Sequence, residues 1–168
     1  MNQFLSFARF STKVLLLLVC FSLACTTVTA KKKSITQTRY DIDGMEVGTQ
    51  GTYLVKVHIY TQNASVSTDE FKFAAVHGVI FKGVSGKGFS SQKPLAKAES
   101  EKQHSDFYQA FFDNGDFTSY ANVITPNSER VKMSNKEYKI SAVVSVSKDE
   151  LRRALETAGM IRNLNSGF

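Results

Sequence analysis

The chain has 168 residues, of which 42% are hydrophobic, 21% are charged and 11% are aromatic, and its formal net charge at pH 7 is +6. This balance is typical of a globular protein and excludes a disordered, collagen-like or disulfide-rich chain. The basic residues form no nucleic-acid-binding pattern, so we expect no nucleic-acid partner.

Residues 1–30 predict a secretory signal peptide. Arg9 and Lys13 precede an apolar run of 11 residues at 14–24, and Val28 and Ala30 suit a cleavage site. A membrane-spanning helix needs about 20 apolar residues, so a retained anchor is the less favoured alternative. We expect cleavage after Ala30, and a periplasmic or secreted mature chain with no membrane span.

Cys25 offers a second processing route. Ser22-Leu23-Ala24-Cys25 resembles the box at which a lipoprotein cysteine is lipidated, although serine stands where leucine is preferred. Lipidation at Cys25 would make the protein an outer-membrane lipoprotein. Both cysteines precede residue 31, so the mature chain is expected to contain no disulfide, no thiolate metal site and no cysteine nucleophile.

The clearest predicted strand covers residues 52–61, where Val55, Val57 and Ile59 alternate with polar residues. Residues 138–146 alternate in the same way. Period-two alternation indicates a strand with one face on a core. We therefore expect two half-buried strands here.

Two weaker strands are expected beside these. Residues 130–133 alternate weakly and precede Ser134-Asn135, a pair suited to a tight hairpin turn into the strand at 138–146. Residues 35–42 form a poorer strand, expected to pair with 52–61 across the glycine-bearing link at 44–51.

Helix signals lie between and after the strands. Ser67 with Glu70 predicts a capping box at the start of a helix that runs toward Phe81. Ser147 with Glu150 predicts a second capping box, for a final helix that ends at Gly159.

A third helix is expected at residues 104–112, after a long irregular stretch at 83–102. The order is strand, strand, helix, long loop, helix, strand, strand, helix. Hairpins interleaved with helices predict an α+β fold. We expect an antiparallel sheet of about four strands with helices packed on one face, as a single domain over residues 31–168.

The loop from Gly83 to Lys102 is the candidate binding region. Lys82, Lys87 and Lys93, with Phe89 among them, could hold an anionic ligand, since long loops are often functional. Surface lysines that hold no ligand are the alternative. The glycines at 83, 86 and 88 do not have the spacing of a phosphate-binding loop.

The histidines indicate no local metal site. His58, His77 and His104 have neither the i,i+2 nor the i,i+4 spacing of neighbouring ligands. No pattern of a nucleophile, base or cofactor loop is present in the sequence. We therefore expect no catalytic residue, metal or cofactor, and a protein that is not an enzyme.

Three segments carry a resemblance to a known group of proteins. Residues 48–57, 75–83 and 92–96 (GTQGTYLVKV, AVHGVIFKG and QKPLA) resemble small secreted bacterial proteins of unknown function. Residues 143–160 are similar to the domain of small outer-membrane lipoproteins and the flagellar assembly T protein. The resemblance implies a place in the cell envelope and no particular reaction.

The leading hypothesis is an exported cell-envelope protein that acts as a non-enzymatic interaction or accessory module, with an envelope protein or polymer as partner. The alternative is a periplasmic binding domain for a small anionic ligand or glycan. The sequence leaves the oligomeric state open.

Overall fold

A computed structural model describes residues 38–47, 51–134 and 136–163. All of them belong to one compact unit, which covers residues 34–168. The predicted signal peptide, the cleavage site after Ala30 and the candidate lipidation site Cys25 lie outside the described residues.

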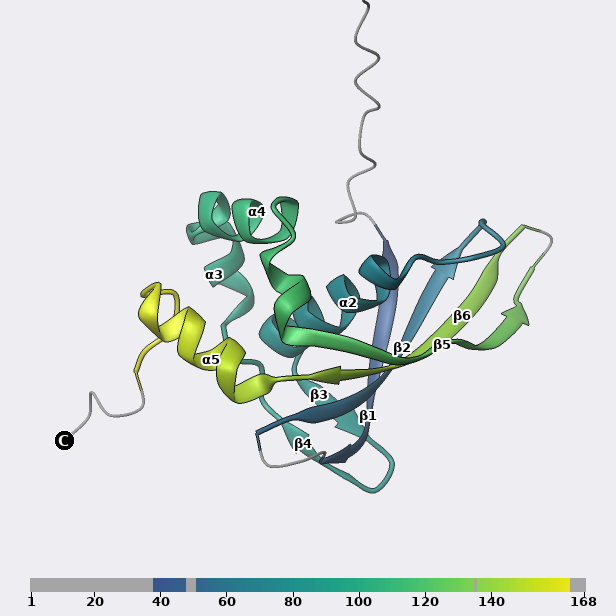
Figure 1. Cartoon of the computed structure of the whole chain (residues 1–168), viewed down its shortest axis with the longest axis horizontal. Helices are drawn as coiled ribbons and strands as arrows, with labels where there is room; N and C mark the ends of the chain where they lie inside the picture. Colours follow the sequence, from purple (N-terminus) through teal and green to yellow (C-terminus); the bar gives the residue numbers. More distant parts are fainter. Residues whose placement is uncertain (1–37, 48–50, 135, 164–168) are drawn as a thin grey trace, which may run out of the picture. The chain divides into compact units, whose positions relative to one another are not determined.

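Four strands form an antiparallel sheet in the order β1-β2-β6-β5 (Figure 1). The strands are β1 (Arg39–Val47), β2 (Tyr53–Thr61), β5 (Ala121–Lys132) and β6 (Tyr138–Val146). The predicted α+β class and four-stranded antiparallel sheet are confirmed. The two clearest predicted strands, β2 and β6, occupy its centre.

The outer strands differ most from their predicted bounds. β1 runs past the expected end at residue 42 to Val47 and pairs with β2 as expected, while residues 35–37 of the expected strand lie outside the described residues. β5 starts at Ala121, long before the expected 130–133. Its register shifts between Val123 and Thr125 and again before Glu129, so the strand bulges away from β6 in the middle.

One face of the sheet is covered by helix α2 (Thr68–His77), which contacts all four strands. The apolar side chains that alternate along β2 and β6 point to this face and are buried: Val55, Val57, Ile59, Ile140, Ala142, Val144 and Val146. Burial of such side chains is the main favourable contribution to folding, at about 25 cal/mol per Å² of apolar surface. The period-two pattern is therefore explained by a helix packed on one face.

The predicted capping box at the start of α2 is confirmed. The side chain of Ser67 accepts a hydrogen bond from the backbone N–H of Glu70, and the backbone N–H of Ser67 donates to the Glu70 carboxylate. The helix continues as a π-helical segment, η2 (Gly78–Lys82), and stops at Gly83, whose φ of 76° favours glycine. Gly78 lets the helix approach β1, because a Cβ there would overlap Ile42.

The stretch expected to be irregular, residues 83–102, contains regular structure. It forms a hairpin of β3 (Val84–Gly86) and β4 (Phe89–Gln92), followed by the short helix α3 (Ala98–Gln103). Helix α4 (Ser105–Asp113), close to the predicted 104–112, and the 3₁₀-helix η3 (Asp116–Tyr120) lead into β5.

The last helix, α5 (Lys148–Thr157), ends as predicted at Gly159, where φ is 74° and the N–H of Met160 donates to the carbonyl of Leu155 at 2.9 Å. The capping box at its start is a wrong prediction, because the Ser147 side chain makes no cap hydrogen bond. The backbone N–H of Ser147 instead donates to the carbonyl of Tyr120 at 2.9 Å. It is therefore already bonded and does not need the Glu150 carboxylate.

No helix within the described residues is long and apolar enough to cross a membrane.

Candidate functional site

The four residues of the predicted binding loop do not form one cluster. Lys82 lies at the end of η2, where its ammonium donates to the Tyr40 carbonyl at 2.9 Å and sits 3.7 Å from the centre of the Tyr40 ring. Lys87 lies in the turn between β3 and β4, whereas Lys93 follows β4 at the other end of that hairpin, and both are exposed. Anion binding by these lysines stays a prediction.

Phe89 has a structural role in this hairpin. Its side chain is only 8% exposed and its ring meets the Tyr53 ring edge-on, with the centroids 5.8 Å apart. The ring also lies directly on Gly44 of β1, where an added Cβ would be 2.5 Å from its Cδ1. Phe89 therefore fixes the hairpin to β1 and is not available to stack on a ligand.

A histidine, a serine and an aspartate meet on the face of the sheet opposite α2. Nδ1 of His58 lies 2.8 Å from Oγ of Ser141, and Nε2 lies 3.1 Å from Oδ2 of Asp43. Because a carboxylate only accepts, the neutral ring carries its proton on Nε2 and accepts from the serine hydroxyl. Burial, followed by the charge of Lys139, lowers the pKa of His58, while Asp43 opposes the shift.

These three residues have the composition of a hydrolytic triad without its accessibility. A nucleophilic serine must reach the substrate, but Ser141 is 1% exposed and its hydroxyl is bonded to His58 on the neighbouring strand. The bonds instead connect β1, β2 and β6 across the sheet. The arrangement supports a structural clamp better than a catalytic centre.

A second group of hydrogen-bonded polar side chains lies on the helical side of the sheet. The hydroxyl of Tyr40 lies 2.5 Å from Nδ1 of His77, whose Nε2 lies 3.0 Å from Oε1 of Glu101. Burial lowers the pKa of His77 and raises that of Tyr40. Phe73 and Phe81 pack on the same imidazole, with ring centroids 5.3 Å and 4.9 Å away. These hydrogen bonds connect β1, α2 and α3, and the three side chains are one another's partners.

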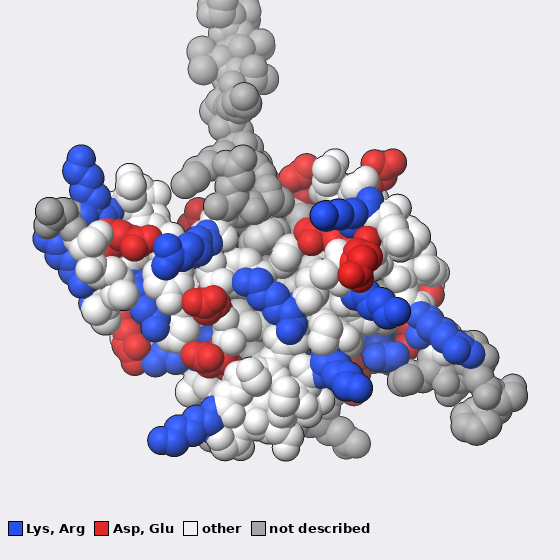
Figure 2. Space-filling view, turned by 180° about the vertical axis from the view of Figure 1, so that it is seen from behind, with Lys and Arg blue, Asp and Glu red and all other residues white. Residues whose placement is uncertain are grey.

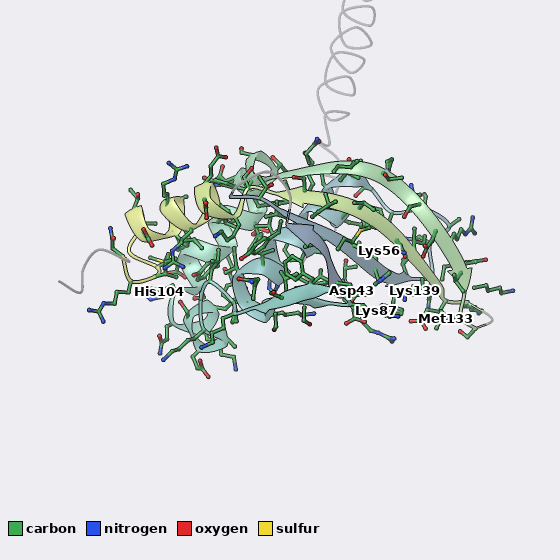
Figure 3. The ribbon with its side chains drawn as sticks, turned by 90° about the horizontal axis from the view of Figure 1, so that it is seen from below. Asp43, Lys56, Lys87, His104, Met133 and Lys139 are labelled. Atoms are coloured by element: carbon green, nitrogen blue, oxygen red, sulfur yellow. The ribbon has the colours of Figure 1, made fainter. Side chains whose placement is uncertain are left out.

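His104 belongs to neither of these two hydrogen-bonded groups. It lies between α3 and α4, and Figure 3 shows it at one end of the molecule, away from Asp43 and Lys56. The three histidines therefore lie in separate places: His58 on the face opposite α2, His77 at the end of α2, and His104 between α3 and α4. Among the residues that the structure describes, no three His, Cys, Asp or Glu side chains are grouped to hold a metal ion.

A surface cleft of about 560 Å³ lies between α3 and the segment after α5. Leu95, Met160 and Ile161 give it an apolar wall, and Lys97 and His104 are among its polar groups. Its volume is within the range of small-molecule sites. No sequence pattern predicts this cleft, because its two sides are about 60 residues apart and meet only in the folded chain.

The charged side chains show no preference for one sign on the face drawn in Figure 2, where Lys and Arg are interspersed with Asp and Glu. Such a surface does not by itself indicate a polyanionic partner.

The two edges of the sheet differ. At the β1 edge, the β3–β4 hairpin packs against the strand, with Gly86 on the backbone of Gly44. At the β5 edge, every residue from Ile124 to Lys132 is exposed. Figure 1 shows the end of the β5–β6 hairpin extending beyond α2. An open edge strand is a ready template for another strand.

Large apolar side chains are exposed along the same edge strand. Ile124 is 53% exposed, Val131 is 50% exposed, and Met133, just after the strand, is 54% exposed. Val131 and Met133 are two residues apart and so point to the same face. Open main-chain groups and exposed apolar side chains coincide in this segment, which makes it the strongest candidate interaction site.

Comparison of the chain with family models, with curated proteins and with solved structures finds no match. The candidate site therefore rests on the geometry alone.

Proposed function

We propose that this protein is an exported cell-envelope component that acts by binding a partner protein, as a non-enzymatic interaction or accessory module. The observation that carries the proposal is the contrast between the two sheet edges. The hairpin packed on β1 restricts one edge, whereas β5 offers exposed backbone and apolar side chains at the other.

The polar clusters favour binding over catalysis. Ser141 is buried and bonded to His58, and His77 is bonded on both ring nitrogens to Tyr40 and Glu101. A general base needs a free position facing a substrate. Groups that already bond one another, with Ser141 and His58 buried, are better suited to holding the sheet and helices together.

Site-specific photocrosslinking tests the interaction. A photoreactive phenylalanine analogue at Val131 of the full chain, in the producing cells, should yield a discrete crosslinked species. The same analogue at Ser91, an exposed residue of β4, is the matched control. Crosslinks of equal pattern at both positions, or none at Val131, would contradict the proposal.

The intact mass of the protein recovered from those cells tests export and processing. We expect the mass of residues 31–168, from cleavage after Ala30. A mass that fits triacylated Cys25–Phe168 would replace this proposal with membrane anchoring as a lipoprotein. A mass that fits the full chain would contradict processing by either route.

A second candidate function is the binding of a small anionic ligand, which the cleft beside α3 favours. Its apolar wall, with Lys97 and His104 nearby, fits an anion that has a short apolar body. Hexanoate serves as a probe, with hexanol as its uncharged counterpart, and thermal unfolding of the full chain as the measurement.

Charge-reversal variants decide where such an anion binds. If the cleft is the site, Lys97→Glu should abolish the stabilisation by hexanoate, while Lys93→Glu, outside the cleft, should leave it unchanged. If the β3–β4 loop is the site, the Lys87→Ala/Lys93→Ala double variant should abolish it. Equal stabilisation by hexanol would remove the role of charge.

A further inference from the structure

The end of the β5–β6 hairpin has a defined set of outward-facing backbone groups. The N–H of Met133 donates to the carbonyl of Glu137 at 2.9 Å, and Val131 pairs with Lys139. Because hydrogen-bonding direction alternates along an antiparallel strand, the N–H and C=O groups of Arg130 and Lys132 point away from β6. These are the groups that a further strand would bond.

The bulge limits the length of strand that can be added. Pro126 has no N–H to donate, and Asn127 has a φ of 49°, which interrupts the extended backbone. The register with β6 becomes regular again from Glu129 onward. The receptive segment is therefore Glu129–Met133, long enough for about five residues of an incoming strand.

The side chains of this segment divide by character. Val131 and Met133 point to the face that carries Lys56 and Lys139, whereas Arg130 and Lys132 point to the other face. The side chains of Glu129–Met133 are exposed on both faces, although Ile140, which pairs with Arg130, is buried. An added strand would therefore meet Val131 and Met133, next to the paired Glu129, on one face, and the cationic side chains of Arg130 and Lys132 on the other.

Charge in the receptive segment is predominantly positive. Glu129, the acidic residue of the receptive segment, is paired with Lys56 at 2.6 Å. Arg130 lies 4.4 Å from the centre of the Tyr138 ring, a contact that leaves its charge uncompensated. Lys132 adds a second positive charge on the same face. Complementarity calls for acidic residues at alternate positions of the incoming strand.

A second copy of this chain would pair poorly with the open edge of β5. Two-fold pairing of β5 with itself around Val131 would place Arg130 directly opposite Lys132 of the other copy. Like charges in directly opposed positions destabilise strand pairing. The same two residues therefore discourage self-association and favour an acidic partner.

We infer that Glu129–Met133 binds an extended segment of a partner protein by strand addition, and that this segment alternates acidic with apolar residues. The inference rests on the proposed function and names its partner class. Main-chain hydrogen bonds supply affinity in this mode, and alternate side chains supply specificity.

Two synthetic probes test the chemistry: the capped hexapeptide Glu-Val-Glu-Val-Glu-Val and its counterpart with lysine for glutamate. Titrated into the isotope-labelled full chain, the acidic peptide should shift the amide resonances of Arg130 and Lys132. It should bind at least ~10-fold more tightly than the basic peptide, since charge reversal replaces attraction with repulsion. No shift with the acidic peptide would overturn the inference.

Two variants at Lys132 separate the contribution of its backbone hydrogen bond to peptide binding from that of its side-chain charge. Lys132→Pro removes the outward N–H and the charge, and should abolish binding of the acidic peptide. Lys132→Ala removes only the charge, and should weaken binding by a few-fold. Undiminished binding to Lys132→Pro, with the circular dichroism spectrum unchanged, would exclude strand addition.

The outcome also distinguishes this inference from the proposed function. A crosslink at Val131 together with equal binding of the two peptides would refute the acidic chemistry and leave the interaction module standing. Absence of both the crosslink and peptide binding would refute both.

Discussion

The contact between Gly86 and Gly44 allows a quantitative test of how the β1 edge is covered. A Cβ on Gly86 would overlap the carbonyl oxygen of Gly44 and lie 2.9 Å from both its N and its C. Those atoms belong to the backbone of a paired strand and cannot rotate away. Gly86→Ala should therefore force the hairpin off β1 or strain the strand, and overpacking of this kind costs about 1–3 kcal/mol or more.

Gly44→Ala offers a contrasting clash on the same contact. The new methyl would meet the Phe89 ring, 2.5 Å from Cδ1 and 2.6 Å from Cγ, and this obstacle is a removable side chain. Phe89→Ala, which removes both of these atoms, should recover part of the loss caused by Gly44→Ala, but little of that caused by Gly86→Ala. The cycle thus separates a side-chain clash from a backbone clash.

Urea unfolding followed by circular dichroism measures these free energies. Gly88→Ala is the matched control, because a Cβ there meets nothing within 4 Å and only its φ of 80° makes alanine unfavourable. That strain amounts to about 1–2 kcal/mol. If Gly86→Ala proved no more destabilising than Gly88→Ala, the close packing of the hairpin on β1 would be refuted.

Three further predictions concern stability. Burial lowers the pKa of His77 below the value of 6.5 that applies to the unfolded chain; the associated stability is fully present above pH 6.5 and is lost as the pH falls through the folded pKa. His77→Gln should therefore flatten the fall in unfolding free energy between pH 7.5 and 5, and an unchanged pH profile would argue against it. Ser67→Ala should cost about 1 kcal/mol in urea unfolding through the lost cap, whereas Ser147→Ala, with no cap bond, should cost under ~0.5 kcal/mol; equal losses would contradict the cap assignment. Leu155→Ala, at a fully buried position, should cost about 2–5 kcal/mol by the same assay, and a loss below ~1 kcal/mol would mean that α5 is not firmly packed.

Those parts of the fold whose burial is one-sided could be predicted from the sequence. β2 and β6 alternate because α2 covers only one of their faces. β5 was largely missed because both of its faces are exposed beyond Val123, so no core imposes a period on its side chains. Helix α3 was missed for a related reason, since Ala98–Gln103 has no buried residue and hence no apolar stripe.

The candidate site was less predictable than the fold. His58 and Ser141 are 83 positions apart, and only the pairing of β2 with β6 places them side by side. Phe89, predicted to assist ligand binding, is buried against Gly44. The two residues are 45 positions apart, so the local sequence around either one does not predict the contact. The value of β5 as an interaction site depends on its place at the edge, and the sequence left the strand order undetermined.

The strand order also has a consequence for when the chain can fold. The two central strands, β2 and β6, are separated by about 80 residues, so the middle of the sheet closes only after nearly the whole chain is available. Closing so long a loop is entropically costly, and folds dominated by distant contacts form slowly. During synthesis, β2 therefore cannot pair with its central neighbour until β6 has been made. For a protein proposed to leave the cytoplasm, this delay would keep the chain unfolded, and so able to pass through a translocation channel, until export is well under way.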